Sequence, residues 1–195
     1  MKILFRITFI IFLISFTTII SAQNKYGAFG APVIKYTSIS NQNALILGGK
    51  FGLVINESIV IGGGFYGNIS EIYTDFIDKL SGQKVILNMN YGGLEFEYIL
   101  FPHSSIHGTI GMLLAGGGLY FGVSDKSVPH GSYAKLDLLV YEPSVNIEFN
   151  SLSWLHIDLN MSYCIITSYN RITYGISKDD LVGPSVGLIF KFGSY

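Results

Sequence analysis

The sequence has little charge, a single cysteine and, after its N-terminal segment, no apolar run suited to a membrane-spanning helix. Only 13% of the 195 residues are charged, against about 25% in soluble domains, and 49% are hydrophobic. The lone Cys164 excludes an intramolecular disulfide. A net charge of −1 excludes the basic surface that nucleic-acid binding needs. Such an apolar chain must be held together by its core or by a membrane.

The first part of the chain is typical of a secretory signal. Lys2 and Arg6 give it positive charge, and residues 8–20 form an uncharged apolar stretch that is too short to span a bilayer as a helix. Small residues follow, as signal cleavage requires. We therefore predict a cleaved signal peptide at 1–22 and a single exported domain at 23–195.

Glycine and aromatic residues are abundant, and the glycines count against long helices. The most helix-like apolar segment, 106–121, contains Gly108, Gly111 and three consecutive glycines at 116–118, and each interior glycine costs a helix about 1 kcal/mol. Alternation fits better. In 155–165, for example, the odd-numbered residues are apolar and the even-numbered ones are mostly polar. A period of two residues predicts a β-strand with one apolar and one polar face.

Turn signals divide the chain into eight such segments. The predicted strands are 26–39, 44–55, 59–70, 85–100, 106–122, 135–149, 154–169 and 184–193. Short connections near 56–58, 102–105 and 150–153 alternate with longer polar ones at 71–84, 123–134 and 170–183, after a first, shorter one at 40–43. This pattern predicts an all-β fold, an eight-stranded antiparallel up-and-down transmembrane β-barrel, with short turns and long loops at opposite ends.

The polar faces of these strands carry isolated charges separated by glycine, serine and asparagine. A water-exposed exterior would hold far more lysine and glutamate, so we expect the polar face to line the lumen and the apolar face to meet lipid. Ile157 should then face lipid and Ser162 the lumen. The predicted lumen network consists of Lys50, Glu95, Glu97, Glu142, Glu148, His156, Asp158 and Lys191. Because its five acids outnumber its two lysines, Lys35, His156, water or a protonated acid must balance the charge.

One predicted strand does not keep a single phase. In 85–100, apolar residues occupy odd positions up to Tyr91 and even positions from Leu94 onward, with Gly92 and Gly93 between them. Two explanations are open. A β-bulge lies at the glycine pair, or the first half projects beyond the membrane, where facing no longer matters.

Four glycine-rich stretches of the chain resemble a known group of proteins. They lie at 49–56, 61–67, 91–98 and 181–193. They are similar to a family of small, glycine-rich secreted proteins described as outer-membrane β-barrels of unknown function. The resemblance covers most of the exported domain and implies a bacterial outer-membrane location and an OmpA/OmpX-like architecture. It brings no catalytic residues with it.

Two motifs suggest binding chemistry but have simpler interpretations. Gly62, Gly64 and Gly67 spell G-x-G-x-x-G, yet no helix follows to present its amides to a dinucleotide, so these glycines indicate a strand bend. His103 and His107 are four residues apart, which on a strand separates them by about 13 Å, too far to share one metal ion. Neither motif predicts a cofactor or a metal site.

Catalytic residue types occur once on a single face. His156, Asp158 and Ser162 are the types found in a hydrolytic triad, but the outer two lie about 20 Å apart on one strand. Some barrel lipid A deacylases carry His and Ser two residues apart, and the corresponding His156-x-Asp158 here lacks the nucleophile. Asp179 and Asp180 could bind a divalent cation together with lipopolysaccharide phosphates, although a solvated loop is the simpler interpretation.

These observations predict a monomeric barrel with a structural or surface-interaction role and no enzymatic activity. We expect its lumen to be plugged and non-conducting, and its function to lie in the extracellular loops. The expected partners are outer-membrane lipid and lipopolysaccharide, the outer-membrane assembly machinery through the C-terminal strand, and an unknown extracellular ligand. Two alternatives stay open: a barrel enzyme acting on envelope lipid, and a secreted lipocalin-like carrier, which needs an apolar interior.

Overall fold

The computed structural model describes residues 26–79, 82–123, 134–167 and 175–194, and most of these lie in β-strands. The predicted signal peptide falls outside the described residues. Within them, no helix has the length and apolar character needed to cross a membrane.

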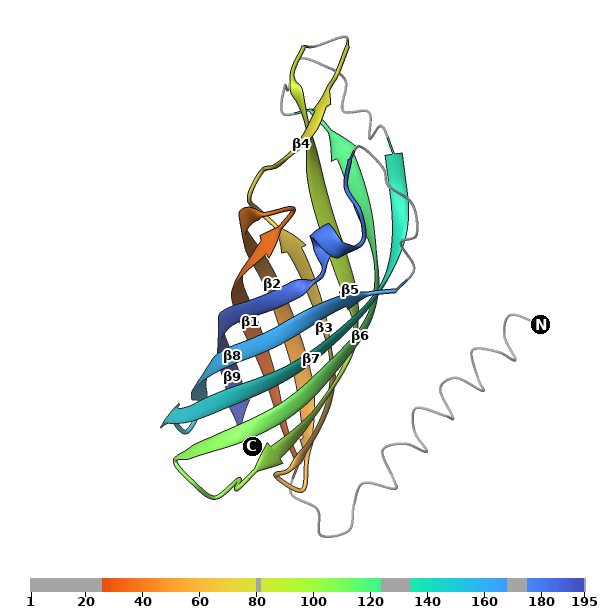
Figure 1. Cartoon of the computed structure of the whole chain (residues 1–195). Helices are drawn as coiled ribbons and strands as arrows, with labels where there is room; N and C mark the ends of the chain where they lie inside the picture. Colours follow the sequence, from red (N-terminus) through yellow and green to blue (C-terminus); the bar gives the residue numbers. More distant parts are fainter. Residues whose placement is uncertain (1–25, 80–81, 124–133, 168–174, 195) are drawn as a thin grey trace, which may run out of the picture.

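The described residues form a single closed sheet. Its elements are β1 (Tyr26–Ile39), β2 (Gln42–Ile55), β3 (Ile59–Asn68), β4 (Ile72–Ile77), β5 (Lys84–Leu100), β6 (Ile106–Gly122), β7 (Ala134–Leu152), β8 (Leu155–Ile166) and β9 (Gly183–Ser194), with a 3₁₀ turn η1 (Asp179–Leu181) before β9. Neighbours pair antiparallel in the order β3-β2-β1-β9-β8-β7-β6-β5-β4, and β3 also pairs with β5. Eight strands therefore close into a ring that leaves out β4 (Figure 1), which confirms the predicted eight-stranded antiparallel barrel.

The two ends of the barrel differ. At the short-turn end, tight connections join β2 to β3, β5 to β6 and β7 to β8, at residues 56–58, 101–105 and 153–154. The opposite end, where β1 turns into β2 and where β6 ends and β7 begins, we call the long-loop end. Both termini of the described chain lie at the short-turn end, because Ala28 near the start of β1 pairs with Ser194 at the end of β9.

The predicted loop 71–84 is wrong in part, because it contains a strand. β4 pairs with β5 at Ile72 and Tyr73, and this hairpin rises beyond the ring at the long-loop end (Figure 1). Ile72 and Thr74 are buried and Tyr73 is exposed, but the strand has only six residues, too few for a clear pattern. The Gln42 side chain covers its edge: Nε2 donates to the carbonyl of Tyr73 (2.6 Å), and Oε1 accepts from the Tyr73 N–H (3.1 Å).

The outer surface of the ring is apolar, as predicted. Every ring strand exposes large hydrophobic side chains, among them Ile34, Leu47, Phe65, Leu94, Ile110, Val145, Met161 and Leu188. On β8, Ser162 is buried in the lumen, and Ile157 lies on the outer face between Phe149 and Phe190 of the neighbouring strands. Such a continuous apolar belt is unusual for a protein surrounded by water and suits one surrounded by lipid.

Of the two explanations for the phase change in β5, the bulge is wrong, and the projection of the first half beyond the membrane needs one change. The pairing of β5 with β3 and with β6 continues without a register shift through Gly92 and Gly93, so this strand has no bulge there. In the first half of the strand the side chains still have a fixed orientation, because Leu87 and Met89 are buried on the same inner face as Glu95. The strand keeps one phase, and it is the polarity of the interior that changes.

The interior of the long-loop half is hydrophobic. We call its buried side chains the apolar layer: Ile39, Ala44, Ile46, Ile72, Val85, Leu87, Met89, Leu119, Phe121, Leu138, Val140, Ile166, Ile176 and Leu181. The last two come from the segment leading into β9, where η1 contacts β1 and β8. Residues of this connection therefore fold inward and contribute to closing the barrel at that end.

Candidate functional site

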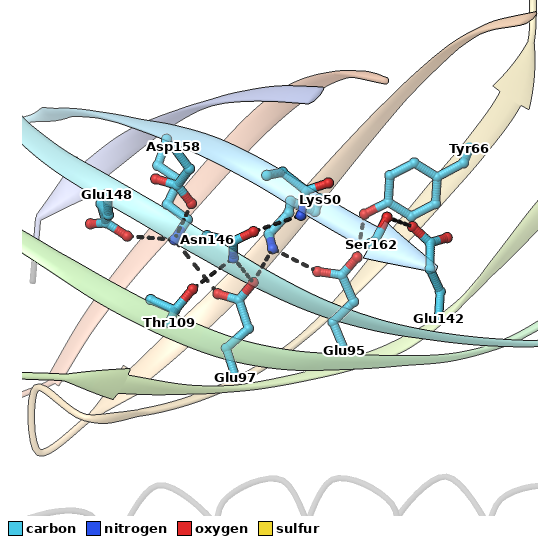
Figure 2. Close-up of polar contacts among 12 residues, drawn as sticks. Lys50, Tyr66, Glu95, Glu97, Thr109, Glu142, Asn146, Glu148, Asp158 and Ser162 are labelled. Atoms are coloured by element: carbon cyan, nitrogen blue, oxygen red, sulfur yellow. Dashed lines mark hydrogen bonds and ion pairs between the residues drawn. The ribbon is translucent and has the colours of Figure 1, made fainter. Parts of the chain in front are cut away.

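The structure places all eight predicted lumen residues inside the short-turn half of the barrel, where each is buried. They are joined there by further polar side chains from the same inner faces. We call the whole set the polar network: the eight predicted residues together with Lys35, Tyr66, Tyr91, His107, Thr109, Asn146, Asn160 and Ser162. Figure 2 shows much of this set as a row of contacts that runs along the lumen.

The centre of the polar network is Lys50. Its Nζ lies 2.5 Å from Oε1 of Glu97 and 2.9 Å from Oε2 of Glu95 (Figure 2). Asn146 links this centre to the next strands, because its Nδ2 donates to Oγ1 of Thr109 (2.6 Å) and its Oδ1 accepts from Asn160 (2.6 Å). One cation thus holds two carboxylates that point inward from a single strand, β5.

Toward the short-turn end, Lys191 is the second cation and is completely buried. Its Nζ lies 2.7 Å from Oε2 of Glu148, 2.8 Å from Oδ2 of Asp158 and 3.6 Å from Oε2 of Glu97. Oε1 of Glu148 lies 3.3 Å from a ring nitrogen of both His107 and His156. This group gathers four strands, β5, β7, β8 and β9, around one ammonium.

Toward the apolar layer, Lys35 is the third cation. Its Nζ contacts Oε1 of Glu142 at 2.5 Å and lies 4.0 Å from the centre of the Tyr66 ring. Tyr91 and Ser162 donate to the same carboxylate, at 3.0 and 2.5 Å. The Tyr66 hydroxyl donates to Glu95, so this third group is continuous with the centre.

The charges alternate in sign along the lumen. Five carboxylates face three lysines and two histidines, and the contacts run in the order Glu148, Lys191, Glu97, Lys50, Glu95, Tyr66, Lys35, Glu142. Lys35 and His156, which the sequence analysis named as balancing groups, both contact these acids. Buried charges are tolerated only when they are paired and hydrogen-bonded, and this arrangement pairs charged groups from different strands, most of which are not neighbours in the ring.

Glycines make room for these long side chains. A Cβ added at Gly64 would lie 2.5 Å from Oε1 of Glu95, and one added at Gly111 would lie 2.6 Å from Oγ of Ser144 and 3.3 Å from Cγ of Glu97. A side chain at either position would displace the polar contacts. The G-x-G-x-x-G run that includes Gly64 lies on β3, and Gly64 makes room for a lumen side chain, a role that differs from the predicted strand bend.

Little free space is left between these side chains. A cavity of about 20 Å³ lies within the polar network and is lined by Lys35, Lys50, Tyr66, Glu95 and Glu142 among others. One water molecule needs at least roughly 10–15 Å³. This cavity has room for about one water molecule.

Sequence reasoning missed some members of the polar network and named Lys35 only as a balancing group. Lys35 follows Ala31 and Val33 on the inner face of β1, so no polar alternation marks its strand. Tyr66 and Tyr91 count as aromatic, apolar residues in the sequence, although their hydroxyl groups donate hydrogen bonds to Glu95 and Glu142. His107 could have been found, because it alternates with Thr109 at the start of β6.

The remaining chemical candidates are not assembled into a catalytic or metal site. His156 contacts Glu148 and Asn150, Asp158 contacts Lys191, and Ser162 contacts Glu142, so the triad residue types are spread over different partners. Among the described residues, no group of three or more His, Cys, Asp or Glu side chains is arranged to hold a metal ion.

The other candidate pairs are separated in the same way. His103 lies 3.4 Å from Glu57 in the short turns, whereas His107 points into the lumen. Asp180 accepts hydrogen bonds from the N–H and hydroxyl of Ser177, at 2.7 and 2.6 Å, and so fixes the turn before β9. The two histidines therefore have different surroundings, and Asp180 is engaged within its own turn.

Comparison with known proteins adds information about the fold alone. No protein-family model and no curated protein matches the sequence. Among solved structures, Neisserial surface protein A superposes with a TM-score of 0.60 at 8% identity, over 87% of this chain and 97% of that one. The N-terminal β-barrel domain of Pseudomonas aeruginosa OprF gives 0.54 at 10% identity, over 88% and 99%.

A third similar structure is Ail, the attachment invasion locus protein of Yersinia pestis, solved in complex with the heparin analogue sucrose octasulfate. It gives a TM-score of 0.50 at 11% identity, over 87% of this chain and 97% of that one. The chain has the fold of these small outer-membrane barrels, in agreement with the resemblance seen in its glycine-rich segments.

Proposed function

We propose that this protein is a monomeric, non-conducting barrel of the bacterial outer membrane that acts through its long-loop end. The apolar belt on the ring supports the membrane placement, since every ring strand exposes hydrophobic side chains. The likeness in fold to outer-membrane barrels supports the choice of membrane. A lipocalin-like carrier would present the opposite surface, polar outside and apolar inside.

The observation that carries the non-conducting role is the way the lumen is filled. Eight strands enclose a space just wide enough for side chains. Here the polar network occupies the short-turn half; a cavity of about 20 Å³ lies within it, and a cavity of about 220 Å³ lies beside His107 and His156 at the short-turn mouth. Beyond it, the apolar layer occupies the long-loop half. An ion crossing the barrel would have to displace the paired charges of the polar network and then pass between the packed side chains of the apolar layer.

Conductance in a planar lipid bilayer tests this role. The purified protein should give no steady current steps at concentrations where a porin, added to the same bilayer, gives them readily. Substituting Lys50→Ala and Glu142→Ala together should still give no steps, because the apolar layer stays intact. Reproducible single-channel steps from the native protein would overturn the proposal.

The proposal also fixes an orientation, with the long-loop end outside the cell and both mature termini in the periplasm. In a Cys164→Ala background, Lys178→Cys near η1 should react with a membrane-impermeant maleimide on intact cells. Ser151→Cys, at the short-turn end, should react only after the outer membrane is permeabilised. The reverse pattern would overturn the orientation.

Partners follow from the same arrangement. Outer-membrane lipid would surround the apolar belt, and β9, the C-terminal strand, would be the segment presented to the barrel-assembly machinery. A surface role at the long-loop end would involve an extracellular ligand. The ligand that Ail binds in its solved structure is a property of that protein.

A further inference from the structure

Near the long-loop end, the apolar belt ends in a hollow on one side of the barrel. Over β3, β5 and β6 the outward positions near the long-loop end are occupied by glycine: Gly67, Gly92, Gly116 and Gly118. These glycines form the floor of a groove of about 660 Å³, which we call the rim groove. Its sides are formed by the aromatic residues Phe65 and Tyr120.

The rim groove contains an amide at its centre. Asn90 points outward from β5 and is paired with Gly67 on one side and Gly118 on the other. A Cβ added at Gly67 would lie 2.2 Å from Oδ1 of Asn90, so the glycine allows this amide to lie across the hollow. On the far side of Gly118, β7 presents the exposed Asp137.

A second groove lies across the apolar belt, over β3, β5, β6, β7 and β8. It has a volume of about 690 Å³ and is lined mainly by hydrophobic side chains, including Phe96, Tyr98, Ile110, Met112 and Met161. We call it the belt groove. The exposed side chains of Leu94 and Leu114 lie between it and the rim groove on the paired strands β5 and β6.

The order of these features matches the order of groups in a membrane lipid. The belt groove is apolar and faces hydrocarbon, and the rim groove starts where the outward residues become polar. Amides and phenols both donate and accept hydrogen bonds, which suits hydroxyl groups. Among the described residues that line the rim groove there is no lysine or arginine, so the groove itself offers no cation to a phosphate. A sugar headgroup therefore fits better than a bare phosphate.

We propose that the rim groove and the belt groove together bind one glycolipid of the surrounding bilayer. Asn90 and Tyr120 hydrogen-bond to the sugar hydroxyls, Phe65 packs against the sugar, and an acyl chain lies in the belt groove. The inference rests on the membrane placement proposed above. It gives β5 and β6 a binding role that is separate from the loops.

Fluorescence quenching by brominated lipids tests the site. The native Trp154, the only tryptophan, is replaced by phenylalanine, and Leu139→Trp places a reporter beside Gly116, its partner in the β6–β7 pairing. The protein is reconstituted in phosphatidylcholine vesicles. Increasing fractions of brominated digalactosyl diacylglycerol, brominated phosphatidylcholine or brominated phosphatidylglycerol are then added in parallel series.

The galactolipid should reach half-maximal quenching at a mole fraction about three- to tenfold lower than phosphatidylcholine, the range that one or two net hydrogen bonds supply. Asn90→Ala should remove this preference. Gly116→Leu should remove it by filling the groove, and it should not disturb folding, because an added Cβ there meets nothing nearer than the Leu138 carbonyl at 4.0 Å.

Gly30→Leu is the matched control. Gly30 is exposed on β1, with nothing within 4 Å of an added Cβ, and four strand-to-strand steps separate β1 from β6 in either direction around the ring. This variant should keep the preference. Equal quenching by all three lipids, or a preference for phosphatidylglycerol, would overturn the glycolipid site while leaving the membrane placement intact. No quenching by any brominated lipid would overturn both.

Discussion

The two halves of the barrel interior differ in polarity on the same strands: the buried charges lie in the short-turn half, among apolar side chains such as Val54, Val60 and Ile99, whereas the long-loop half is mainly apolar. Along the inner face of β5, Leu87 and Met89 belong to the apolar layer, and Glu95 and Glu97 belong to the polar network. β7 repeats the change, with Leu138 in one half and Glu148 in the other. The backbone pairing is the same in both halves, so the environment outside the wall must explain the difference.

The outer surface changes in the opposite sense. Next to the polar network, the exterior is the apolar belt. Next to the apolar layer, β5 presents Asn88 and Asn90 outward, and β7 presents Asp137. The short-turn half is thus built like a membrane protein, whereas the long-loop half has a hydrophobic core inside and a mixed exterior, on which Ile69 and Ile77 are also exposed. The change of polarity marks the level at which the barrel leaves the hydrocarbon.

The largest effect should come from breaking the polar network at Lys191. Lys191→Met leaves Glu148 and Asp158 without the ammonium between them. Removing one partner of a buried ion pair costs about 3–5 kcal/mol, and we expect about 4 kcal/mol off the free energy of unfolding. Urea titration in lipid vesicles, followed by the fluorescence of Trp154, measures it.

Two further variants sharpen this result. Lys178→Met removes an exposed lysine near η1 and should change the free energy of unfolding by less than about 0.5 kcal/mol. Adding Glu148→Gln and Asp158→Asn to Lys191→Met should recover much of the loss, because no buried charge is then left unpaired. Equal losses in Lys191→Met and Lys178→Met would contradict the importance of the network.

The apolar layer should respond to lost volume and be indifferent to charge balance. Leu119 is fully buried in it, and Leu119→Ala should cost about 3 kcal/mol through lost burial and the cavity left behind. Leu119→Met, which keeps the volume, should cost less than about 1.5 kcal/mol. The same urea titration applies. A loss in Leu119→Met as large as in Leu119→Ala would show that this half is not packed as a core.

The belt outside the polar network should reject charge. Met161 is exposed on β8 next to the buried Asn160 and Ser162. Met161→Arg should lower the free energy of unfolding in vesicles by about 2 kcal/mol, since arginine on the lipid face costs about 2–4 kcal/mol near the midplane and less toward the interface. Met161→Leu is the control and should be nearly neutral. An Arg variant as stable as the Leu variant would mean that Met161 does not face lipid.

Sequence patterns predicted the short-turn half well for a physical reason. Where lipid lies outside and the lumen is polar, polar and apolar residues must alternate. The alternation in β8 therefore predicts both that the segment is a strand and which side chains point into the lumen. That alternation is enough to place the lysines and acids of those faces in the lumen. Their pairing could not be predicted, because it depends on register between strands, as in the contact of Lys35 with Glu142 across 107 positions of sequence.

The long-loop half was predicted less well, because its outer environment differs. An apolar residue such as Met89 points inward there, although the membrane rule places apolar residues outside. This reversal produced the apparent phase change in β5. β4 was missed since its exposed residues, such as Asp75, resemble those of a loop, and its hydrogen-bonding partners lie on β5 and on Gln42.

The smallest effect concerns the segment that completes the apolar layer at η1. Asp180 accepts two hydrogen bonds from Ser177, its carbonyl accepts from the Ser40 N–H at 2.7 Å, and the buried Leu181 follows directly. Asp180→Ala removes the side-chain bonds and should lower the local opening free energy by about 1 kcal/mol. Because the ring pairing is untouched, this should appear as a roughly fivefold faster hydrogen exchange of the Ser40 and Leu181 amides, with global unfolding nearly unchanged. Asp179→Ala, at the exposed neighbour, should leave that exchange as it is, and equal acceleration in both variants would show that negative charge, rather than the two hydrogen bonds, holds the segment over the barrel.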